Sequence, residues 1–368
     1  MLETARALRD HGVRVRVISM HEPGSRAYEM IDDIEVIRPR YVWPERLEVL
    51  RDEGGGLPAV WRNNRLARAA FPLLLVAQTL ATMRYARDYH ILHAHWTLPA
   101  MAVWAGRAYH RRPFVVTVHG SDIFQAPRIP LVGPVTRMAL SRASRVIAVS
   151  RSLAEATMAL GLPPDRVEVL PDGIDIDRFQ PGPKQREPLI LFVGSLIERK
   201  GVRYLLQALP ALIQKLPEYH LAVVGDGPQR SELVQLAQSL NLATHVTFAG
   251  AQSQAQIGEW MRRARLFVLP SLEEALGIVL LEALASGTPC VATQVGGIPE
   301  VVSPEVGRLV PVADPGALAE AMVAVLGDRA AWGAMSRRAR AHVMENCYTW
   351  KKVASRLIEI YQAALKTL

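Results

Sequence analysis

The sequence is poor in cysteine and has no lysine before residue 184. Its 368 residues include two cysteines, Cys290 and Cys347. Two cysteines exclude a disulfide framework and a four-thiolate metal site, and they fit a reducing compartment. No lysine precedes Lys184, so arginine carries the basic character of the first half. No helix-turn-helix, zinc-finger or RNA-recognition signature is present, which argues against nucleic acid as a partner.

Long hydrophobic runs are also scarce. Residues 1–12 form a charged helical pattern without the apolar centre of a signal peptide. The longest apolar stretch covers residues 69–83 and is interrupted by Pro72 and Gln78. A membrane span needs about 20 apolar residues. The stretch therefore predicts a buried helix, with an interfacial helix as the alternative.

Positive charge exceeds negative charge, and the net charge is +8. Eight arginines stand between Arg107 and Arg151 against one acidic residue, Asp122. Such a stretch can attract phosphate or an anionic membrane surface, although a solvated face of an arginine-rich protein has the same composition. The prediction is a cytoplasmic protein that associates peripherally with the inner face of the membrane. It also rests on four tryptophans of the first half, Trp43, Trp61, Trp96 and Trp104.

Short β-rich runs alternate with helical patterns, which predicts an α/β protein with parallel sheets covered by helices. A proline-rich break at 181–188 separates a first domain, 1–180, from a second domain, 189–346. Residues 347–368 are expected to form a last helix. Its apolar stripe needs a surface to pack against, and the first domain is a candidate for that surface. The expected strands are 13–19, 35–37, 91–93, 114–118, 145–149, 167–170, 189–193, 221–224, 246–248, 266–269, 290–292 and 308–310.

The richest motif lies in residues 270–300, PSLEEALGIVLLEALASGTPCVATQVGGIPE. A strand is followed by a loop with Glu274 and by a helix expected from about 276 to 286, with Glu282 inside it. Two carboxylates at this spacing are also common in solvated helix ends. Free amides at the start of a helix can hold a phosphate or a sugar hydroxyl. Here those amides belong to Leu276, Gly277 and Ile278.

This stretch resembles the glutamate–seven residues–glutamate motif of family 4 retaining glycosyltransferases. Their GT-B fold has two Rossmann-like domains whose parallel sheets face each other across an interdomain cleft. The resemblance implies that Glu282 holds the ribose hydroxyls of a nucleotide sugar, and that Glu274 holds sugar hydroxyls. Ala275 and Leu276 replace the usual Gly-Phe. The matching positions are Pro270, Ser271, Glu274, Gly277, Glu282, Ala283, Gly296, Gly297 and Glu300.

Two further segments resemble the same family. Arg199 and Lys200 follow a strand and a glycine turn, where they could neutralise a diphosphate. Ser195 stands where the family often has arginine, and a basic pair by itself is usually a surface feature. Gly225 and Gly227 lack the third glycine of a dinucleotide fingerprint, so the resemblance places them near the nucleotide instead. A plain strand-to-helix turn explains them equally well.

Histidines follow two expected strands of the first domain. The resemblance makes His119 a contact to the donor sugar, with His95 and Asp122 as acceptor-side candidates. His93 and His95 could instead be structural histidines. Their spacing fits no helical metal motif, so no metal site is predicted.

The resemblance covers essentially the whole chain, with one departure. Family members begin with a strand and a glycine-rich loop before the helix that matches residues 2–10. We expect this first strand and loop to be absent here. We also expect the natural reading frame to extend upstream by about 10–25 residues, and the chain as given to be poorly stable and weakly active.

The sequence therefore predicts a metal-independent retaining glycosyltransferase without a resident cofactor. It would move a sugar from a nucleotide diphosphate sugar to a glycan or lipid-linked acceptor in cell-surface polysaccharide or glycolipid synthesis. A sugar-nucleotide epimerase and a non-catalytic fragment that binds nucleotide sugar remain alternatives. The candidate catalytic residues are His119, Glu274 and Lys200. The candidate donor-binding residues are Arg199, Lys200, Gly225, Gly227, Glu274, Ala275, Leu276, Gly277, Ile278 and Glu282.

Overall fold

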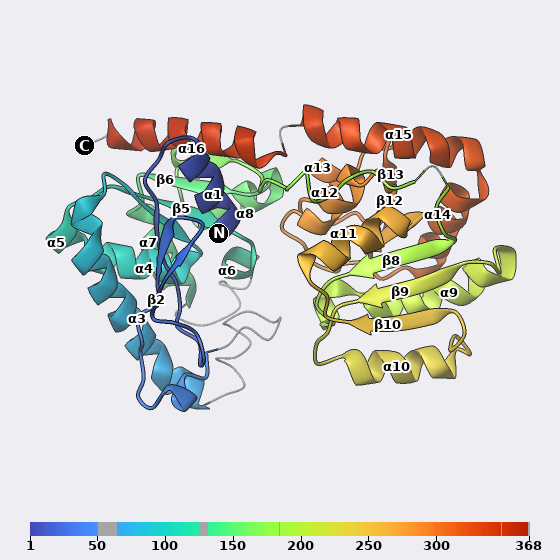
Figure 1. The fold of residues 1–368 in the computed structure, drawn as a ribbon, viewed down its shortest axis with the longest axis horizontal. Helices are drawn as coiled ribbons and strands as arrows, with labels where there is room; N and C mark the ends of the chain where they lie inside the picture. The colour runs from blue at the N-terminus through green and yellow to red at the C-terminus, as the bar shows by residue number, and fades with distance from the viewer. Residues whose placement is uncertain (51–64, 125–131, 184, 347, 367–368) are drawn as a thin grey trace. The chain divides into compact units, whose positions relative to one another are not determined.

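The computed structural model describes residues 1–50, 65–124, 132–183, 185–346 and 348–366 (Figure 1). Trp61 and Cys347 lie outside these residues. The chain forms two compact units. The first comprises Met1–Pro171 together with Trp350–Leu368, and the second comprises Asp172–Thr349.

The second unit is built on a parallel sheet of six strands in the order β10-β9-β8-β11-β12-β13. Strands β8 and β11 are continuous apolar runs, and every residue of β8, β11 and β12 is buried, as strands covered on both faces require. All six strands were predicted to within two residues. They are β8 (Leu189–Val193), β9 (His220–Val224), β10 (Val246–Gly250), β11 (Leu266–Leu269), β12 (Cys290–Thr293) and β13 (Gly307–Val310).

Helices connect these strands, and several begin at a side-chain cap. Ser253 and Gln256 form a reciprocal capping box, while Asp314 and Asp328 accept amide hydrogen bonds at two later helix starts. The helical elements are η5 (Glu198–Lys200), α9 (Val202–Lys215), α10 (Arg230–Ser239), α11 (Gln254–Arg263), α12 (Ile278–Ala285), α13 (Ile298–Val301), α14 (Pro315–Gly327) and α15 (Arg329–Glu345).

The segment predicted as a linker packs on the second unit through Arg186. Its guanidinium is buried and donates to the carbonyl oxygens of Ala264, at 2.9 Å, and Ser286, at 2.6 Å. The change from the first unit to the second falls earlier in the chain, after Pro171. A proline-rich composition marks irregular backbone, and here a buried arginine anchors that backbone.

The first unit contains two sheets. Strands β1 and β3 are parallel and β2 joins them antiparallel, in the order β1-β3-β2, whereas the other four strands form a parallel sheet, β4-β5-β6-β7. Within the described residues, β1 and β4 each pair with one strand. The strands are β1 (Arg16–Ile18), β2 (Tyr28–Ile31), β3 (Ile34–Ile37), β4 (Leu92–His95), β5 (Phe114–Val118), β6 (Arg145–Ala148) and β7 (Val167–Val169).

Two strand predictions in this unit need correction. Strand β2 was missed because its exposed residues alternate with half-buried ones and give no apolar run. The strand expected over 13–19 is limited to Arg16–Ile18. Val13 and Val15 instead pack as partly buried side chains against the hydrophobic core.

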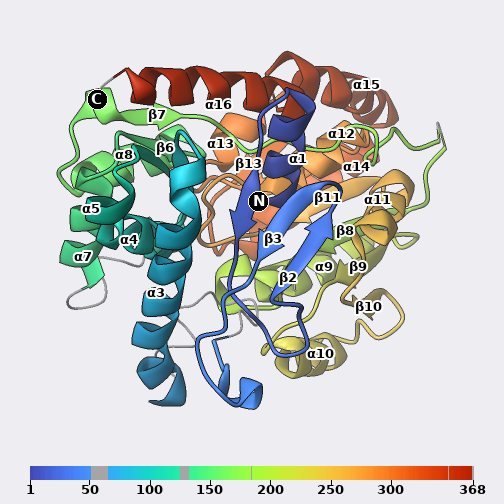
Figure 2. The same cartoon turned by 60° about the vertical axis from the view of Figure 1, so that its left-hand side comes forward.

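The last helix, α16 (Trp350–Leu365), shares a hydrophobic cluster with α1 (Leu2–Asp10) in the first unit (Figure 2). Leu8 of α1 and Leu357 and Ile360 of α16 are buried in this cluster. The remaining helical elements of the unit are η1 (Glu45–Leu47), α3 (Arg65–Tyr85), η2 (Ala86–Asp88), α4 (Thr97–Ala105), α5 (Arg107–His110), α6 (Ser121–Phe124), α7 (Val132–Ser141), α8 (Arg151–Ala159) and η4 (Pro164–Arg166).

Helix α3 contains the long apolar stretch that the sequence predicted to be buried. The structure corrects this prediction, because one face of the helix is exposed. Leu74 is fully buried, whereas Leu73 and Leu80 are 50% and 59% exposed. An apolar run can predict a helix, but it does not determine how many of the helix's faces are buried against other elements.

Candidate functional site

The order of the strands in the second unit defines where its site can form. Strand β8 pairs with β9 on one side and with β11, much later in the chain, on the other. In open α/β sheets, ligands bind beyond the carboxyl ends of the strands at such a reversal of order. The loop after β8 and the loop after β11 meet there, and the amide of Leu272 donates to the carbonyl oxygen of Arg199 at 2.7 Å.

Lys200 and Glu274 form an ion pair between these two loops. Lys200 Nζ lies 2.5 Å from Glu274 Oε2, and the two side chains are 17% and 13% exposed. Ser271 Oγ donates to the same carboxylate oxygen at 3.3 Å. The structure thus brings together two predicted site residues that are 74 positions apart in the chain. Their ion pair is shielded from solvent more than a surface salt bridge is.

Glycines allow the loops to approach this closely. Gly201 has φ +66°, and a Cβ there would lie 2.0 Å from the carbonyl oxygen of Pro270. Gly296 has φ +54°, and a Cβ would lie 1.7 Å from the carbonyl oxygen of Glu274. Both positions need the left-handed backbone conformation and leave no space for a side chain. The main chain around Glu274 is therefore enclosed by glycines from two other loops.

Helix α12 begins two residues later than predicted, at Ile278, because Gly277 takes a left-handed conformation with φ 84° and acts as the N-cap. Within the described chain, no backbone acceptor takes up the amides of Leu276, Gly277 and Ile278. Such amides, with the positive end of the helix dipole, form an anion-binding position. The side chain of Leu276 is itself buried, so it contributes to the core while its amide stays available.

Glu282 lies on the second turn of α12 and is 7% exposed. No hydrogen bond to its carboxylate is found in the described part of the chain. Burial raises its pKa to about 7, and the positive charge of Arg178 opposes this rise. A buried carboxylate that lacks donors is costly, and hydroxyl groups of a ligand could supply them.

Gly225 and Gly227 lie at the carboxyl end of β9 and contact the loop after β8. A Cβ on Gly225 would lie 1.9 Å from the carbonyl oxygen of Gly194, and a Cβ on Gly227 would lie 2.6 Å from that of Leu196. Packing between the two loops therefore explains why these positions are glycine. Arg199 on the neighbouring loop is half-buried, and its guanidinium has no hydrogen-bond or ionic partner among the residues described.

In the first unit, His95 and His119 are joined at the carboxyl ends of β4 and β5. His95 Nδ1 lies 2.9 Å from His119 Nε2, and the rings stack with centroids 5.2 Å apart. Trp96 adds a third ring, 4.7 Å from that of His119, from a backbone with φ 66°. Burial and the neighbouring His93 lower the pKa of His95, so its ring is neutral and one of the two imidazoles donates to the other.

His93 is a structural histidine, one of the two interpretations left open by the sequence. Its Nδ1 lies 2.6 Å from the Tyr361 hydroxyl and its Nε2 lies 2.7 Å from Thr117 Oγ1. Burial lowers its pKa to about 3, so it remains neutral at physiological pH. Its ring stacks on that of His95 at 4.5 Å between centroids and supports it on one face.

Asp122 fixes the loop after β5. Its Oδ1 accepts hydrogen bonds from the amides of His119 and Gly120, at 3.2 and 3.1 Å. Its Oδ2 is buried without a hydrogen-bond partner in the described structure, and burial raises the pKa of the carboxyl. Asp122 thus shapes the backbone beside His119 and keeps one oxygen unused.

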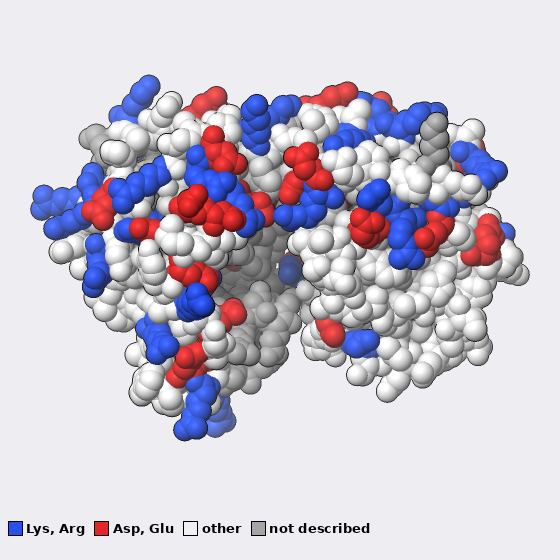
Figure 3. Space-filling view, in the orientation of Figure 1, with Lys and Arg blue, Asp and Glu red and all other residues white. Residues whose placement is uncertain are grey.

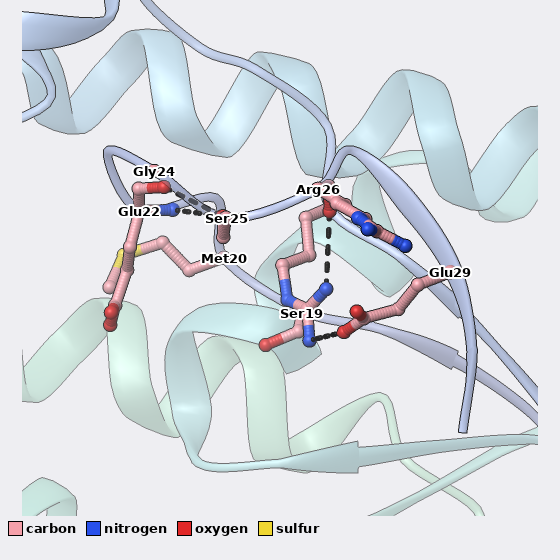
Figure 4. A pocket seen from close by; sticks show the side chains of 8 residues that line it. Ser19, Met20, Glu22, Gly24, Ser25, Arg26 and Glu29 are labelled. Carbon is pink, nitrogen blue, oxygen red and sulfur yellow. Dashed lines mark hydrogen bonds and ion pairs between the residues drawn. The ribbon is translucent and has the colours of Figure 1, made fainter. Parts of the chain in front are cut away.

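A separate polar cavity of about 460 Å³ lies at the carboxyl ends of β1 and β3 (Figure 4). None of the predicted site residues lines it. Arg38 in its wall pairs with Glu29 at 2.6 Å and donates to the Arg26 carbonyl, while Ser25 bonds to the backbone of Glu22. These groups satisfy one another, so we assign no ligand to this cavity.

The sequence named Ser271 as a motif position without giving it a role, and the structure shows that it binds Glu274. Two further contributors were missed: Trp96 packs on His119, and Tyr361 reaches the histidines from the last helix. Trp96 directly follows His95, which was an available signal. Tyr361 gave no such signal, because its partner His93 is 268 positions away.

In the described ranges, no group of three His, Cys, Asp or Glu side chains is arranged to hold a metal ion.

Comparison with known families agrees with this architecture. Residues 173–342 match the family glycosyl transferases group 1, and residues 1–178 match glycosyltransferase family 4. The chain belongs to the group 1, family 4 glycosyltransferases and has the GT-B fold. The family resemblance and the prediction of a glycosyltransferase are thereby confirmed.

Individual relatives act on different acceptors. A D-inositol 3-phosphate glycosyltransferase of Nocardia farcinica is 32% identical, over 75% of this chain and 67% of its own. A GDP-mannose-dependent alpha-(1-6)-phosphatidylinositol monomannoside mannosyltransferase of Mycolicibacterium smegmatis is 31% identical, over 80% and 83%. Among solved structures, sucrose-phosphate synthase from Thermosynechococcus elongatus superposes with a TM-score of 0.81 at 25% identity, covering 100% of this chain and 92% of that one.

Proposed function

We propose that this glycosyltransferase moves a hexose, with retention of configuration, from a nucleotide diphosphate sugar to a glycan or lipid-linked acceptor. One observation carries the proposal. The buried carboxylate of Glu282 has no donor among the described residues, and it lies on the same helix as the open amides of residues 276–278. A nucleotide diphosphate sugar has hydroxyls for the first group and an anion for the second.

Glu282 would hold the ribose. The two neighbouring hydroxyls of a ribose can both donate to one carboxylate, and hydrogen bonds to a charged group contribute about 1.5–3 kcal/mol each. These bonds favour the ionised form, so the ligand would return the pKa of Glu282 from about 7 toward its ordinary range.

The diphosphate would lie between the loop after β8 and the start of α12. Lys200 and Arg199 supply positive charge, and the amides of Leu276, Gly277 and Ile278 supply donors at the positive end of the helix dipole. As the bond to the sugar breaks, negative charge grows on the departing diphosphate. Fixed groups of this kind stabilise that charge and thereby lower the barrier.

Glu274 would bind hydroxyls of the transferred sugar. Its pairing with Lys200 at 2.5 Å and with Ser271 at 3.3 Å leaves its second carboxylate oxygen for the ligand. The pair also holds the Lys200 ammonium near the place assigned to the phosphates. A single ion pair would in this way orient a sugar contact and a phosphate contact together.

The first unit would supply His119 as a contact to the donor sugar and His95 and Asp122 as groups on the acceptor side. The neutral ring of His95 fixes the orientation of His119 through the 2.9 Å hydrogen bond. Asp122 Oδ1 holds the loop beside His119, and this position next to His119 is what places Asp122 on the acceptor side in the proposal. A lipid-linked acceptor would require the protein to work at the inner surface of the membrane.

The test is an assay with UDP- and GDP-hexoses, with and without phosphorylated polyol or lipid acceptors, in the presence of EDTA. Transfer to an acceptor, with the anomeric configuration of donor and product compared by NMR, is the expected result. Conversion of the nucleotide sugar without an acceptor would instead identify an epimerase. Binding without any turnover would identify a non-catalytic nucleotide-sugar protein.

A further inference from the structure

Helix α3 carries an exposed apolar stripe along its whole length. The exposed fractions of its side chains are 60% for Leu66, 50% for Leu73, 55% for Val76 and 59% for Leu80. With the exposed Ala69 between the first two, these residues recur at alternating spacings of three and four. That spacing places them on one side of a helix. They form what we call the α3 stripe.

The opposite face of α3 is packed against the first unit. Ala67, Ala70 and Leu74 are buried in a cluster with Tyr41 and Leu98. Residues Arg65–Asp88 are long and apolar enough to cross a membrane, because an 18-residue window within them has a mean hydropathy of 1.4. The buried face nevertheless ties the helix to the unit along its side, so a surface-lying position fits this packing and a spanning one does not.

The charged side chains of α3 itself are all basic. No acidic residue occurs from Arg65 to Arg87, and exposed arginines stand at both ends, with Arg65 at the start and Arg84 near the end. Near that end Arg112 donates to the carbonyl oxygen of Arg87 at 2.7 Å, which brings basic groups of the 107–151 stretch beside α3. In Figure 3, the basic side chains at the lower tip of the first unit have acidic side chains beside them.

We propose that the α3 stripe docks on an anionic lipid bilayer. Aliphatic side chains with arginines at their margins match the acyl and headgroup layers of such a surface. The stripe contains no aromatic residue and no hydrogen-bonding side chain of the kind that anchors protein–protein interfaces. A second copy is disfavoured, because neither face would offer a carboxylate to the arginines of the other. Docking would bring the protein to the bilayer that contains a lipid-linked acceptor, and to that extent the proposal rests on the proposed function.

The test measures binding of the full chain to vesicles of phosphatidylcholine with and without phosphatidylglycerol. The variant Leu73→Ser/Leu80→Ser removes the centre of the stripe, and we expect about a tenfold or greater loss of binding to anionic vesicles. The variant Arg65→Gln/Arg84→Gln should reduce the preference for anionic over neutral vesicles. The control Tyr28→Ser/Met30→Ser alters residues of similar exposure on β2, 57% and 53%, and should bind as the unaltered protein does.

Nucleotide diphosphate binding, measured by calorimetry without vesicles, separates this proposal from the proposed function. All three variants should retain it, because none alters a residue of the second unit. Equal vesicle binding by the stripe variant and the control would overturn the docking proposal. So would a dimer in solution that the stripe variant abolishes without any vesicle binding. Vesicle binding without nucleotide binding would support docking and contradict the proposed function.

Discussion

The hydroxyl of Tyr361 lies 2.6 Å from Nδ1 of His93 and joins the last helix to the histidines of β4. The other ring nitrogen is held by Thr117 at 2.7 Å, so both nitrogens of a neutral imidazole are satisfied. His93 in turn stacks on His95, the partner of His119. The C-terminal helix therefore orients the candidate site of the first unit without lining it.

Removal of this hydroxyl should destabilise the protein. Tyr361→Phe leaves one buried ring nitrogen of His93 unpaired, and we expect a loss of about 1–3 kcal/mol in the free energy of unfolding. Urea denaturation of the variant and of the control Tyr28→Phe, at an exposed tyrosine, measures the effect. Equal unfolding midpoints for both variants would show that the hydrogen bond contributes nothing.

Glu282 should make stability depend on pH. Its pKa is about 7 in the folded protein, against an ordinary value of 4.5 for an exposed glutamate, so the folded state favours the protonated form. The free energy of unfolding of the unaltered protein, compared with that of Glu282→Gln, should be independent of pH below about pH 4.5. It should then fall by a total of about 3 kcal/mol as the pH rises to 7. Denaturation of both proteins at pH 4.5, 6 and 8 gives this difference. Parallel profiles would contradict the raised pKa.

The same group should couple donor binding to proton release. Ribose hydroxyls that bind the ionised carboxylate would displace its proton when a nucleoside diphosphate binds at pH 6. Calorimetry in two buffers of different ionisation enthalpy measures the number of protons released. Glu282→Gln should release none from this position and bind about 10- to 150-fold more weakly. Unchanged affinity would remove the ribose assignment.

Lys200 should act on the phosphates. We expect Lys200→Ala to weaken nucleoside diphosphate binding by about tenfold or more while leaving nucleoside binding nearly unchanged, because its ammonium is assigned to the diphosphate. Lys215→Ala removes an exposed lysine from the end of α9 and serves as the control. Similar losses for nucleoside and diphosphate would make Lys200 a purely structural partner of Glu274.

Gly296 should tolerate no side chain. In Gly296→Ala the new Cβ would overlap the carbonyl oxygen of Glu274, which lies 1.7 Å away, at a backbone φ of +54°. We expect a loss of about 2 kcal/mol or more in stability, together with weaker diphosphate binding. Gly327→Ala, where no atom lies within 4 Å, should be neutral or slightly stabilising. An unaltered melting temperature in Gly296→Ala would contradict the enclosed backbone around Glu274.

The sequence predicted the second unit better than the first for a physical reason. Buried parallel strands such as β8 and β11 are apolar along their whole length, and their pattern is visible locally. Strand β2 is half exposed and lacks that pattern. The sequence also could not predict which face of α3 remains exposed. Leu73 and Leu74 are both leucines, yet the first is half exposed and the second is fully buried.

The candidate site divides along similar lines. The spacing of Glu274 and Glu282 and the basic pair at Arg199 are local motifs, and family resemblance identified them. The contact of Lys200 with Glu274 depends on β8 and β11 being neighbours in the sheet, which strand order alone determines. The link from Tyr361 to His93 depends on where the last helix packs, and no local pattern contains that information.

The return of α16 to the first unit has a consequence for synthesis. Leu8, Val115 and Ile147 form one core cluster with residues of α16, while the whole second unit is made in between. On the ribosome the second unit, which is continuous in the chain, emerges complete before the first unit can close. The N-terminal half must therefore wait with an open apolar surface until residues 350–364 leave the exit tunnel, which makes the nascent chain a candidate client for chaperones.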